Sequence, residues 1–359
     1  MKVSIGSRVI DGPWGGGNLF VINLKKFLIR NGHQVVHDLC DRDVDIILLT
    51  DPRSRKESSS TFNNIDIMKY KKYVNPNVVV IQRINECDER KGTNYINKFY
   101  LEASKSSDHV IFVSNWLREI YLNIGMPISK TSVIMSGADS DIFNDIDSAE
   151  FSKDNIKFVT HHWSSHVNKG FDIYLEFDEI LDLDKYKNIE FTYIGNVPPE
   201  IKFKNINIKN ALFGKKLADE IKSHHIYLTA SKNEPSGNHH IEAAQCGLPI
   251  LYLNSGGIPE YCKGFGVDFI DDFEEGLNKI ILEYHLHKKN MNKYPYSSNV
   301  MCEEFFNKFI DIQNNKDIVD DNINKFVTFV FLQKNKIQRI FTNFTLKQVV
   351  KKYLKRFLK

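Results

Sequence analysis

The sequence predicts an α/β protein built from two Rossmann-like domains. Its 359 residues are enough for two domains of ordinary size. A strand at residues 2–9, a glycine-rich loop at 12–17, a helix at 18–30 and a strand at 34–37 form the first unit of such a domain. A second strand–helix–strand unit lies far along the chain, at 225–253. We therefore expect two sheets, each flanked by helices.

The rest of the first domain alternates apolar runs with helical patterns. Apolar runs of this kind are typical of strands that are buried on both faces. We expect strands at 45–50, 78–84 and 110–113, and helices at 96–103 and 116–124. A polar stretch without periodicity follows at 144–154, and the domain boundary is predicted there.

The second domain begins with a strand at 156–162. Strands are expected next at 189–196 and 206–211, and helices at 171–181, 216–223, 273–285 and 302–314. The two last helices are amphipathic, with an apolar face that can pack on a core.

The stretch 234–260, EPSGNHHIEAAQCGLPILYLNSGGIPE, follows a buried strand at 225–230. Asn238 is expected to N-cap a short helix after a break in the chain. Glu234 then lies on the loop at the carboxyl end of the strand, and Glu242 lies in the first turn of the helix. Ligands bind at this edge of an open α/β sheet, and the free N–H groups of a helix start favour a phosphate.

Two glutamates separated by seven residues, followed by A-A-x-C-G-x-P-I and S-G-G-I-P-E, resemble the donor site of retaining family-four glycosyltransferases. The resemblance implies the glycosyltransferase-B fold, in which two Rossmann-like domains face a cleft, and a last helix that crosses back onto the first domain. It assigns the nucleotide ribose to Glu242 and a catalytic place beside the donor sugar to Glu234. An ordinary strand–helix–strand unit with a capping glutamate is the alternative.

Lys169 precedes the helix at 171–181, after the loop that follows the second domain's first strand. The resemblance assigns it a catalytic role, because its charge would stabilise the diphosphate as the sugar leaves. Relatives carry an arginine five residues earlier, where this chain has Ser164. The change removes a group that could bind an anion through two hydrogen bonds, so donor affinity is expected to be lower unless another cation substitutes. Ser164 remains a donor-binding candidate by its position. A plain surface lysine at 169 is the alternative.

Glycines near the predicted cleft let the backbone approach a ligand closely. Loops at the place of 12–17 touch donor phosphate or acceptor in the family, so Gly16 and Gly17 are donor-binding candidates; a tight turn is the alternative. Gly195 is a candidate as well, since it ends the strand at 189–196 at the ligand edge of the second sheet.

Five histidines lie close to the predicted cleft: His161, His162, His166, His239 and His240. No carboxylate or cysteine spacing completes a zinc site with them, and the fold class works without a metal, so none is expected. Asn238 and His239, at the helix start, are expected to contact donor phosphate or sugar hydroxyls. Packing in the core is the alternative for each histidine.

A polar cluster at 83–90 closes the strand at 78–84. Many relatives place a histidine and an aspartate at this strand end, whereas this chain has no histidine there. Arg83, Asn85 and Glu86 are therefore candidates for contact with the acceptor or the donor sugar. A solvated loop with local ion pairs is the alternative.

Composition narrows the class of protein. No stretch approaches the roughly 20 apolar residues of a membrane span, and Asp11 and neighbouring glycines interrupt the place of a signal-peptide core. The five cysteines are odd in number and form no C-x-x-C pair, which predicts reduced thiols in a cytoplasmic protein.

The C-terminal tail at 322–359 differs in charge from the rest of the chain. It has ten Lys or Arg and no Asp or Glu, so residues 1–321 carry a net −7 against +3 overall. Its apolar residues recur at steps of three and four, which predicts helices with an apolar and a basic face. Two interpretations of the tail are open: it packs on the acidic body of the protein, or it anchors the protein at the inner face of an anionic membrane. Nucleic acid is not expected as a partner.

The predicted organisation has an acceptor-side domain at 1–148, a donor domain at 149–295, a crossover helix at 296–321 and the tail at 322–359. The expected reaction is transfer of a hexosyl group from a nucleotide-diphosphate sugar to a glycan or lipid-linked glycan, in cell-surface glycan synthesis. The nucleotide sugar is a co-substrate, and no cofactor is expected. A catalytically retired nucleotide-sugar-binding protein and a nucleotide-sugar epimerase are the alternatives.

Overall fold

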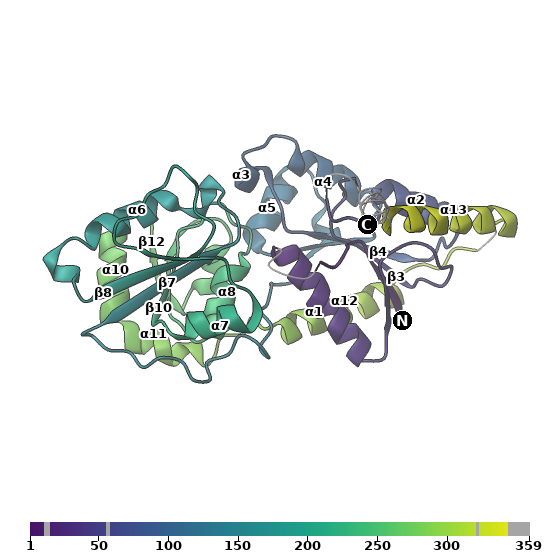
Figure 1. The fold of residues 1–359 in the computed structure, drawn as a ribbon. Coiled ribbons are helices and arrows are strands. Elements are labelled where there is room, and N and C mark those ends of the chain that lie inside the picture. Colours follow the sequence, from purple (N-terminus) through teal and green to yellow (C-terminus); the bar gives the residue numbers. More distant parts are fainter. Residues whose placement is uncertain (11–14, 55–57, 321–322, 344–359) are drawn as a thin grey trace, which may run out of the picture.

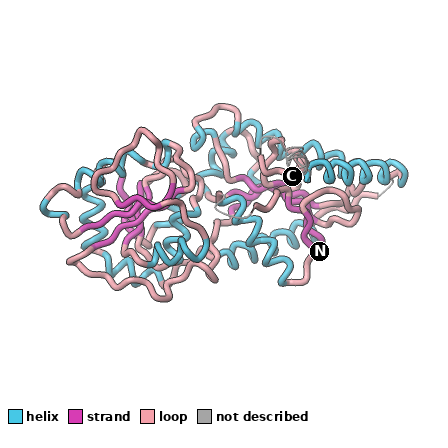
Figure 2. Tube along the Cα trace, in the orientation of Figure 1, coloured by secondary structure: helices cyan, strands magenta, loops and turns pink. Residues whose placement is uncertain are grey.

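The computed structural model describes residues 1–10, 15–54, 58–320 and 323–343. Two parallel six-stranded sheets, each flanked by helices, lie side by side (Figure 1). The strands of each sheet are enclosed by helices and loops (Figure 2). This layering agrees with the sequence, in which the central strands are continuous apolar runs, as parallel strands covered on both faces require.

The N-terminal sheet has the strand order β2-β1-β3-β4-β5-β6. Its strands are β1 (Lys2–Ile5), β2 (Gln34–Val36), β3 (Ile46–Leu49), β4 (Val79–Ile84), β5 (His109–Phe112) and β6 (Thr131–Val133). The helices are α1 (Gly16–Arg30), α2 (Asn64–Tyr73), α3 (Asp88–Lys91), α4 (Ile96–Ser104) and α5 (Asn115–Asn123). All six residues of β4 are buried, so its polar residues Gln82 and Arg83 are buried with the apolar ones.

The C-terminal sheet has the order β12-β11-β10-β7-β8-β9. Its strands are β7 (Ile156–His162), β8 (Ile189–Gly195), β9 (Asn207–Lys209), β10 (Ile226–Thr229), β11 (Ile250–Leu253) and β12 (Gly266–Phe269). The helices are α6 (Phe171–Ile180), α7 (Gly214–Lys222), α8 (Asn238–Gln245), α9 (Ile258–Cys262), α10 (Phe273–Leu282) and α11 (Tyr284–Met291). The carboxyl ends of β7 and β10 place their loops at the N-terminal domain.

The last two helices return to the N-terminal domain. The first, α12 (Ser298–Asn314), packs beside α1, with the Phe20 and Phe305 ring centroids 5.0 Å apart. The second, α13 (Lys325–Asn343), lies along α2, where Thr328 donates a hydrogen bond to the Tyr73 carbonyl. None of the helices in the described part of the chain is long and apolar enough to cross a bilayer.

Three local predictions are wrong. The first strand ends at Ile5 rather than at residue 9. The polar cluster at 83–90, for which no helix was predicted, ends in α3. The predicted helix at 273–285 is two helices, separated at Glu283. Asn238 is the first residue of α8, and Gly237, with a left-handed φ of 75°, occupies the N-cap position. A glycine adopts this φ without steric cost. An asparagine at an N-cap lies in the extended region and does not adopt a left-handed φ.

Candidate active site

The loop between β10 and α8 holds Glu234 in a fixed position. Asn233 has a left-handed φ of 52°, and its N–H donates to the Ser255 hydroxyl at 3.0 Å. Gly257 N–H donates to the Glu234 carbonyl at 2.9 Å. A Cβ on Gly256 would lie 2.7 Å from the Glu234 backbone, so only glycine permits this approach. The S-G-G turn after β11 therefore supports the loop that carries Glu234.

Lys169 reaches Glu234 from the neighbouring strand β7. It ends a 3₁₀ turn, Val167–Lys169, and Gly170 follows with φ 84° where a Cβ would lie 2.2 Å from the Ala230 carbonyl. The glycine thus lets the turn press against the end of β10. Lys169 Nζ lies 2.7 Å from Glu234 Oε2, and both side chains are about one-tenth exposed. The Lys-Gly pair therefore aims a buried ammonium at the carboxylate.

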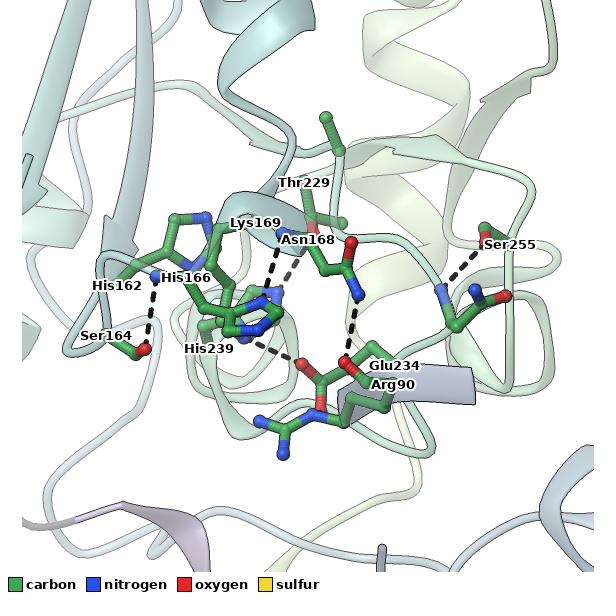
Figure 3. A network of polar contacts seen from close by, with 12 residues as sticks. Arg90, His162, Ser164, His166, Asn168, Lys169, Thr229, Glu234, His239 and Ser255 are labelled. Carbon is green, nitrogen blue, oxygen red and sulfur yellow. Dashed lines mark hydrogen bonds and ion pairs between the residues drawn. The ribbon is translucent and has the colours of Figure 1, made fainter. Parts of the chain in front are cut away.

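Arg90, from α3 of the other domain, is the second partner of Glu234. Its Nε lies 3.0 Å from Glu234 Oε1, and the two side chains lie next to each other (Figure 3). Its Nη1 lies 2.9 Å from Glu86 Oε1. The Arg90 carbonyl also accepts from Asn168 Nδ2 at 2.9 Å. Burial by itself would raise the pKa of Glu234, but Arg90 and Lys169 outweigh it and hold that pKa well below its ordinary value. Sequence reasoning had missed Arg90, since no local pattern links residues in separate domains.

Ser164 lies in the same cavity but acts locally. Its hydroxyl accepts from the His166 N–H at 3.2 Å, which shapes the turn before Lys169. Where relatives place a cation, this chain therefore has a turn-forming hydroxyl. Arg90 and Arg83, both from the N-terminal domain, are the guanidinium groups among the described residues of the cavity.

Glu242 lies inside α8 and faces the same space. Its Oε2 is 2.9 Å from His161 Nε2, and the Tyr227 hydroxyl lies 3.1 Å from the other nitrogen of that ring. Glu242 is 5% exposed, so its carboxylate is largely shielded from solvent and faces His161 and the cavity. The pairing with His161 was not predicted, although both residues stand at the carboxyl edge of the sheet.

Four of the five histidines near the cavity are buried, whereas His166 is exposed. His239 Nε2 lies 2.9 Å from the Thr229 hydroxyl, and His162 Nε2 lies 2.7 Å from the Tyr174 hydroxyl. Burial lowers the pKa of His240 to about 3, and it lowers those of His162 and His239 as well, so these rings are neutral at physiological pH. No cluster of three or more His, Cys, Asp and Glu side chains in the described ranges is arranged to hold a metal ion.

The start of α1 meets the start of α8 across the two domains. A Cβ on Gly16 would lie 2.6 Å from Asn238 Oδ1, so the Gly16 backbone and the Asn238 side chain approach closely. Neither helix has a side-chain cap at its first turn. The free N–H groups and positive dipole ends of two helices therefore lie close together, which favours an anion between them.

The three acceptor-side candidates are placed differently. Arg83 and Asn85 line the cavity, while Glu86 is buried behind it and pairs with Arg90 and Lys91. Gly195 does not line the cavity either: a Cβ there would lie 2.0 Å from the His162 carbonyl, so this glycine allows β8 to pair closely with β7.

The cavity between the domains has a volume of about 400 Å³. This is within the usual range for small-molecule sites. Gly16, Gly17, Asn238, His239 and Glu242 line it together with Lys169 and Glu234. Residues 211–214, which lead from the loop after β9 into the start of α7, also line it and were not singled out from the sequence. The predicted donor-site residues are thus brought to one cavity, Gly195 excepted.

Comparison with known proteins agrees with this architecture. No family model matches the chain. One curated protein, the phosphatidylinositol N-acetylglucosaminyltransferase gpi3 subunit of Schizosaccharomyces pombe, is 27% identical over 212 residues, which cover 55% of this chain and 46% of the relative. The chain thus matches about half the length of that relative.

Solved structures match nearly the whole chain at low sequence identity. A glycosyltransferase from Rickettsia africae ESF-5 has a TM-score of 0.62 and 16% identity, with 88% of this chain and 99% of that one covered. A sucrose-phosphate synthase from Thermosynechococcus elongatus has 0.63 and 13%, with 88% and 100% covered. An Anabaena protein in complex with UDP and glucose has 0.60 and 12%, with 86% and 99% covered. The chain therefore has the glycosyltransferase-B fold.

Proposed function

We propose that this protein is a retaining glycosyltransferase, which moves a sugar from a nucleotide-diphosphate sugar to an acceptor hydroxyl. One observation carries the proposal: Lys169, Glu234, Glu242 and the uncapped start of α8 line a single interdomain cavity. Fold alone would not support an activity, because folds of this kind host many functions. The chemistry of these groups supports one.

Each group fits one part of such a donor. Lys169 and the α8 N–H groups would bind the diphosphate, whose negative charge grows as the sugar leaves. Glu234 would accept hydrogen bonds from the donor sugar, and Glu242 from the ribose hydroxyls, in place of His161. Arg90 would supply the cation that Ser164 lacks, since it already lies beside Glu234. Departure of a diphosphate stabilised in this way requires no protein nucleophile.

The comparisons favour a uridine nucleotide as part of the donor and a lipid-linked acceptor. The Anabaena neighbour was solved with UDP and glucose, and the curated relative is named as a subunit of an N-acetylglucosaminyltransferase that acts on phosphatidylinositol. We therefore take UDP-sugars as the first donors to test, and a lipid-linked glycan as the first class of acceptor.

Incubation with a panel of nucleotide sugars tests the proposal. Release of nucleoside diphosphate with transfer or hydrolysis of the sugar supports it. An isomerised donor would identify an epimerase, and nucleotide binding without turnover would identify a retired enzyme. Either of these outcomes replaces the proposal.

A lipid-linked acceptor requires access to a membrane, and α13 has a suitable face. One side of α13 packs on the enzyme through Thr328, Phe331 and Leu332. The opposite side exposes Phe326, Phe329, Val330 and Ile337, which are 49–73% accessible. Exposed lysines at 325, 334 and 336 flank this apolar stripe. Basic residues beside an exposed apolar face suit an anionic leaflet, so we assign this face to a membrane surface.

A liposome assay tests that assignment without removing the helix. The full chain should sediment with phosphatidylglycerol vesicles, and Phe326→Glu with Phe329→Glu should lower its partitioning by more than about tenfold, because two inserted rings are lost. The matched control is Leu282→Glu with Leu286→Glu, two exposed leucines on the other domain. Equal sedimentation of both double variants would show that α13 only packs. The basic tail beyond residue 343 lies outside the described residues.

A further inference from the structure

Arg83 is a buried cation at the wall of the cavity. It is the fifth residue of β4, a central strand, and is 4% exposed. Its guanidinium lies over the Phe20 ring of α1, 4.1 Å from the centroid. Stacking on an aromatic ring fixes the plane of a guanidinium and leaves its edge for hydrogen bonding. Arg83 is thus held in place by packing rather than by a charged partner.

Within the described ranges, no carboxylate pairs with Arg83. None of the ion pairs among the described residues includes it, and its Nε has no hydrogen-bond partner. By contrast, Lys169 and Arg90, the buried or half-buried cations that share the cavity, each pair with a carboxylate. Burial of an unpaired charge costs free energy that native proteins avoid unless a ligand completes the site.

The groups around Arg83 do not remove its charge. Burial lowers the pKa of Arg83 to about 10, so the side chain stays protonated at neutral pH. Tyr261 and Tyr100 are the titratable groups that influence the pKa of Arg83, and burial raises the pKa of both phenols, which are therefore neutral. The Tyr261 hydroxyl is also used, because it donates to the Val113 carbonyl. The missing anion must come from the cavity.

The donor already has cations other than Arg83, namely Lys169 and Arg90, and Arg90 reaches across from α3 to Glu234. Lys169 and the start of α8 belong to the C-terminal domain, whereas Arg83 belongs to the N-terminal domain, where the acceptor binds under the proposed function. We infer that the acceptor carries an anionic group, a phosphate or a carboxylate, and that Arg83 binds it through the edge of its guanidinium. This inference rests on the proposed function and adds a substrate class to it. Planar, two-point recognition of such oxyanions is the geometry that arginine provides.

Binding measurements on the full chain test the inference, with the donor site filled first. Pyrophosphate and glucuronate, as probes of the two anion classes, are titrated into protein saturated with UDP. At least one should bind the wild type, and Arg83→Gln should weaken it by tenfold or more. Arg83→Lys, which keeps the charge but loses the fork, should bind with intermediate strength. Arg118→Gln is the control, since Arg118 lies in the same domain, outside the cavity lining, and bonds to Thr131.

The outcomes separate this inference from the proposed function. UDP affinity should stay within twofold in both Arg83 variants. A parallel loss of UDP affinity would mean that Arg83 reads the donor diphosphate, and would overturn the inference. So would failure of both probes to bind the UDP-saturated wild type, or unchanged binding in Arg83→Gln and Arg83→Lys. If the wild type does not bind UDP or any nucleotide sugar, the proposed function itself fails. Thermal melting checks that Arg83→Gln is folded, and Arg83→Lys carries the test if it is not.

Discussion

Glu234 and Arg83 are buried charges that line one cavity from opposite domains, yet they differ in the groups that surround the charge. Glu234 has two cations within 3.0 Å, Lys169 and Arg90. Arg83 has a neutral aromatic ring at 4.1 Å and no counter-ion in the described part of the chain. The C-terminal wall is therefore preorganised by protein charges, whereas the N-terminal wall is completed only by a ligand. Burial of a charge indicates a site in both cases. Only the presence or absence of charged protein partners around it indicates which side of the cavity binds an anion.

Lys169→Ala is the strongest test of the preorganised wall. We expect turnover to fall by about 10²–10³-fold, because the lysine meets the charge that develops on the leaving diphosphate. Binding of UMP should fall much less than turnover, and this difference is measured by steady-state kinetics and calorimetry. Lys232→Ala is the matched control, since Lys232 lies on the loop that carries Glu234 but pairs with Asp172 at the surface. If turnover and UMP affinity fall equally, or neither falls, the lysine has no role in leaving-group stabilisation.

Glu242→Gln tests the same wall at the nucleotide. A charged hydrogen bond to a ribose hydroxyl contributes about 1.5–3 kcal/mol, so UDP affinity should fall by about 10–100-fold. The control is a dideoxy-UDP that lacks both ribose hydroxyls: it should bind the wild type weakly and should lose little more in the variant. Calorimetry measures the affinity of the wild type and of the variant for UDP and for its dideoxy analogue. An equal loss for UDP and its dideoxy analogue would remove the ribose contact from Glu242.

Arg90→Gln tests the ion pair that joins the two walls. Because Arg90 keeps the pKa of Glu234 low, the stability due to Glu234 is fully present above its unfolded pKa and is lost as pH falls through the lowered folded value. Without Arg90 this contribution is smaller, so the variant should be less stable by about 1–2 kcal/mol at pH 7, and the difference should shrink only at strongly acidic pH. Urea unfolding at several pH values measures it. Lys91→Gln is the control, because Lys91 bonds Glu86 but not Glu234; equal losses in the two variants would assign the effect to Glu86.

The sequence by itself determined the α/β class and the positions of most strands, since apolar runs that must be buried on both faces carry their own signal. It also predicted that Glu234, Glu242 and Lys169 lie at the carboxyl edge of the second sheet, because a glycine or proline turn after a strand is a local property of the chain. It assigned Asn238 to the N-cap wrongly, since a cap depends on the φ of Gly237, which composition does not reveal.

Only the tertiary structure decided which charges meet. The pairing of Arg90 with Glu234, the contact of Gly16 with Asn238 and the lack of a counter-ion at Arg83 all depend on how two separate sheets face each other. The same holds for α13, whose pattern predicts an apolar face but not which residues dock on α2 and which remain exposed. Periodicity records the local environment of a side chain, whereas electrostatic partners are fixed by proximity between residues far apart in the chain, and that proximity leaves no local trace in a single sequence.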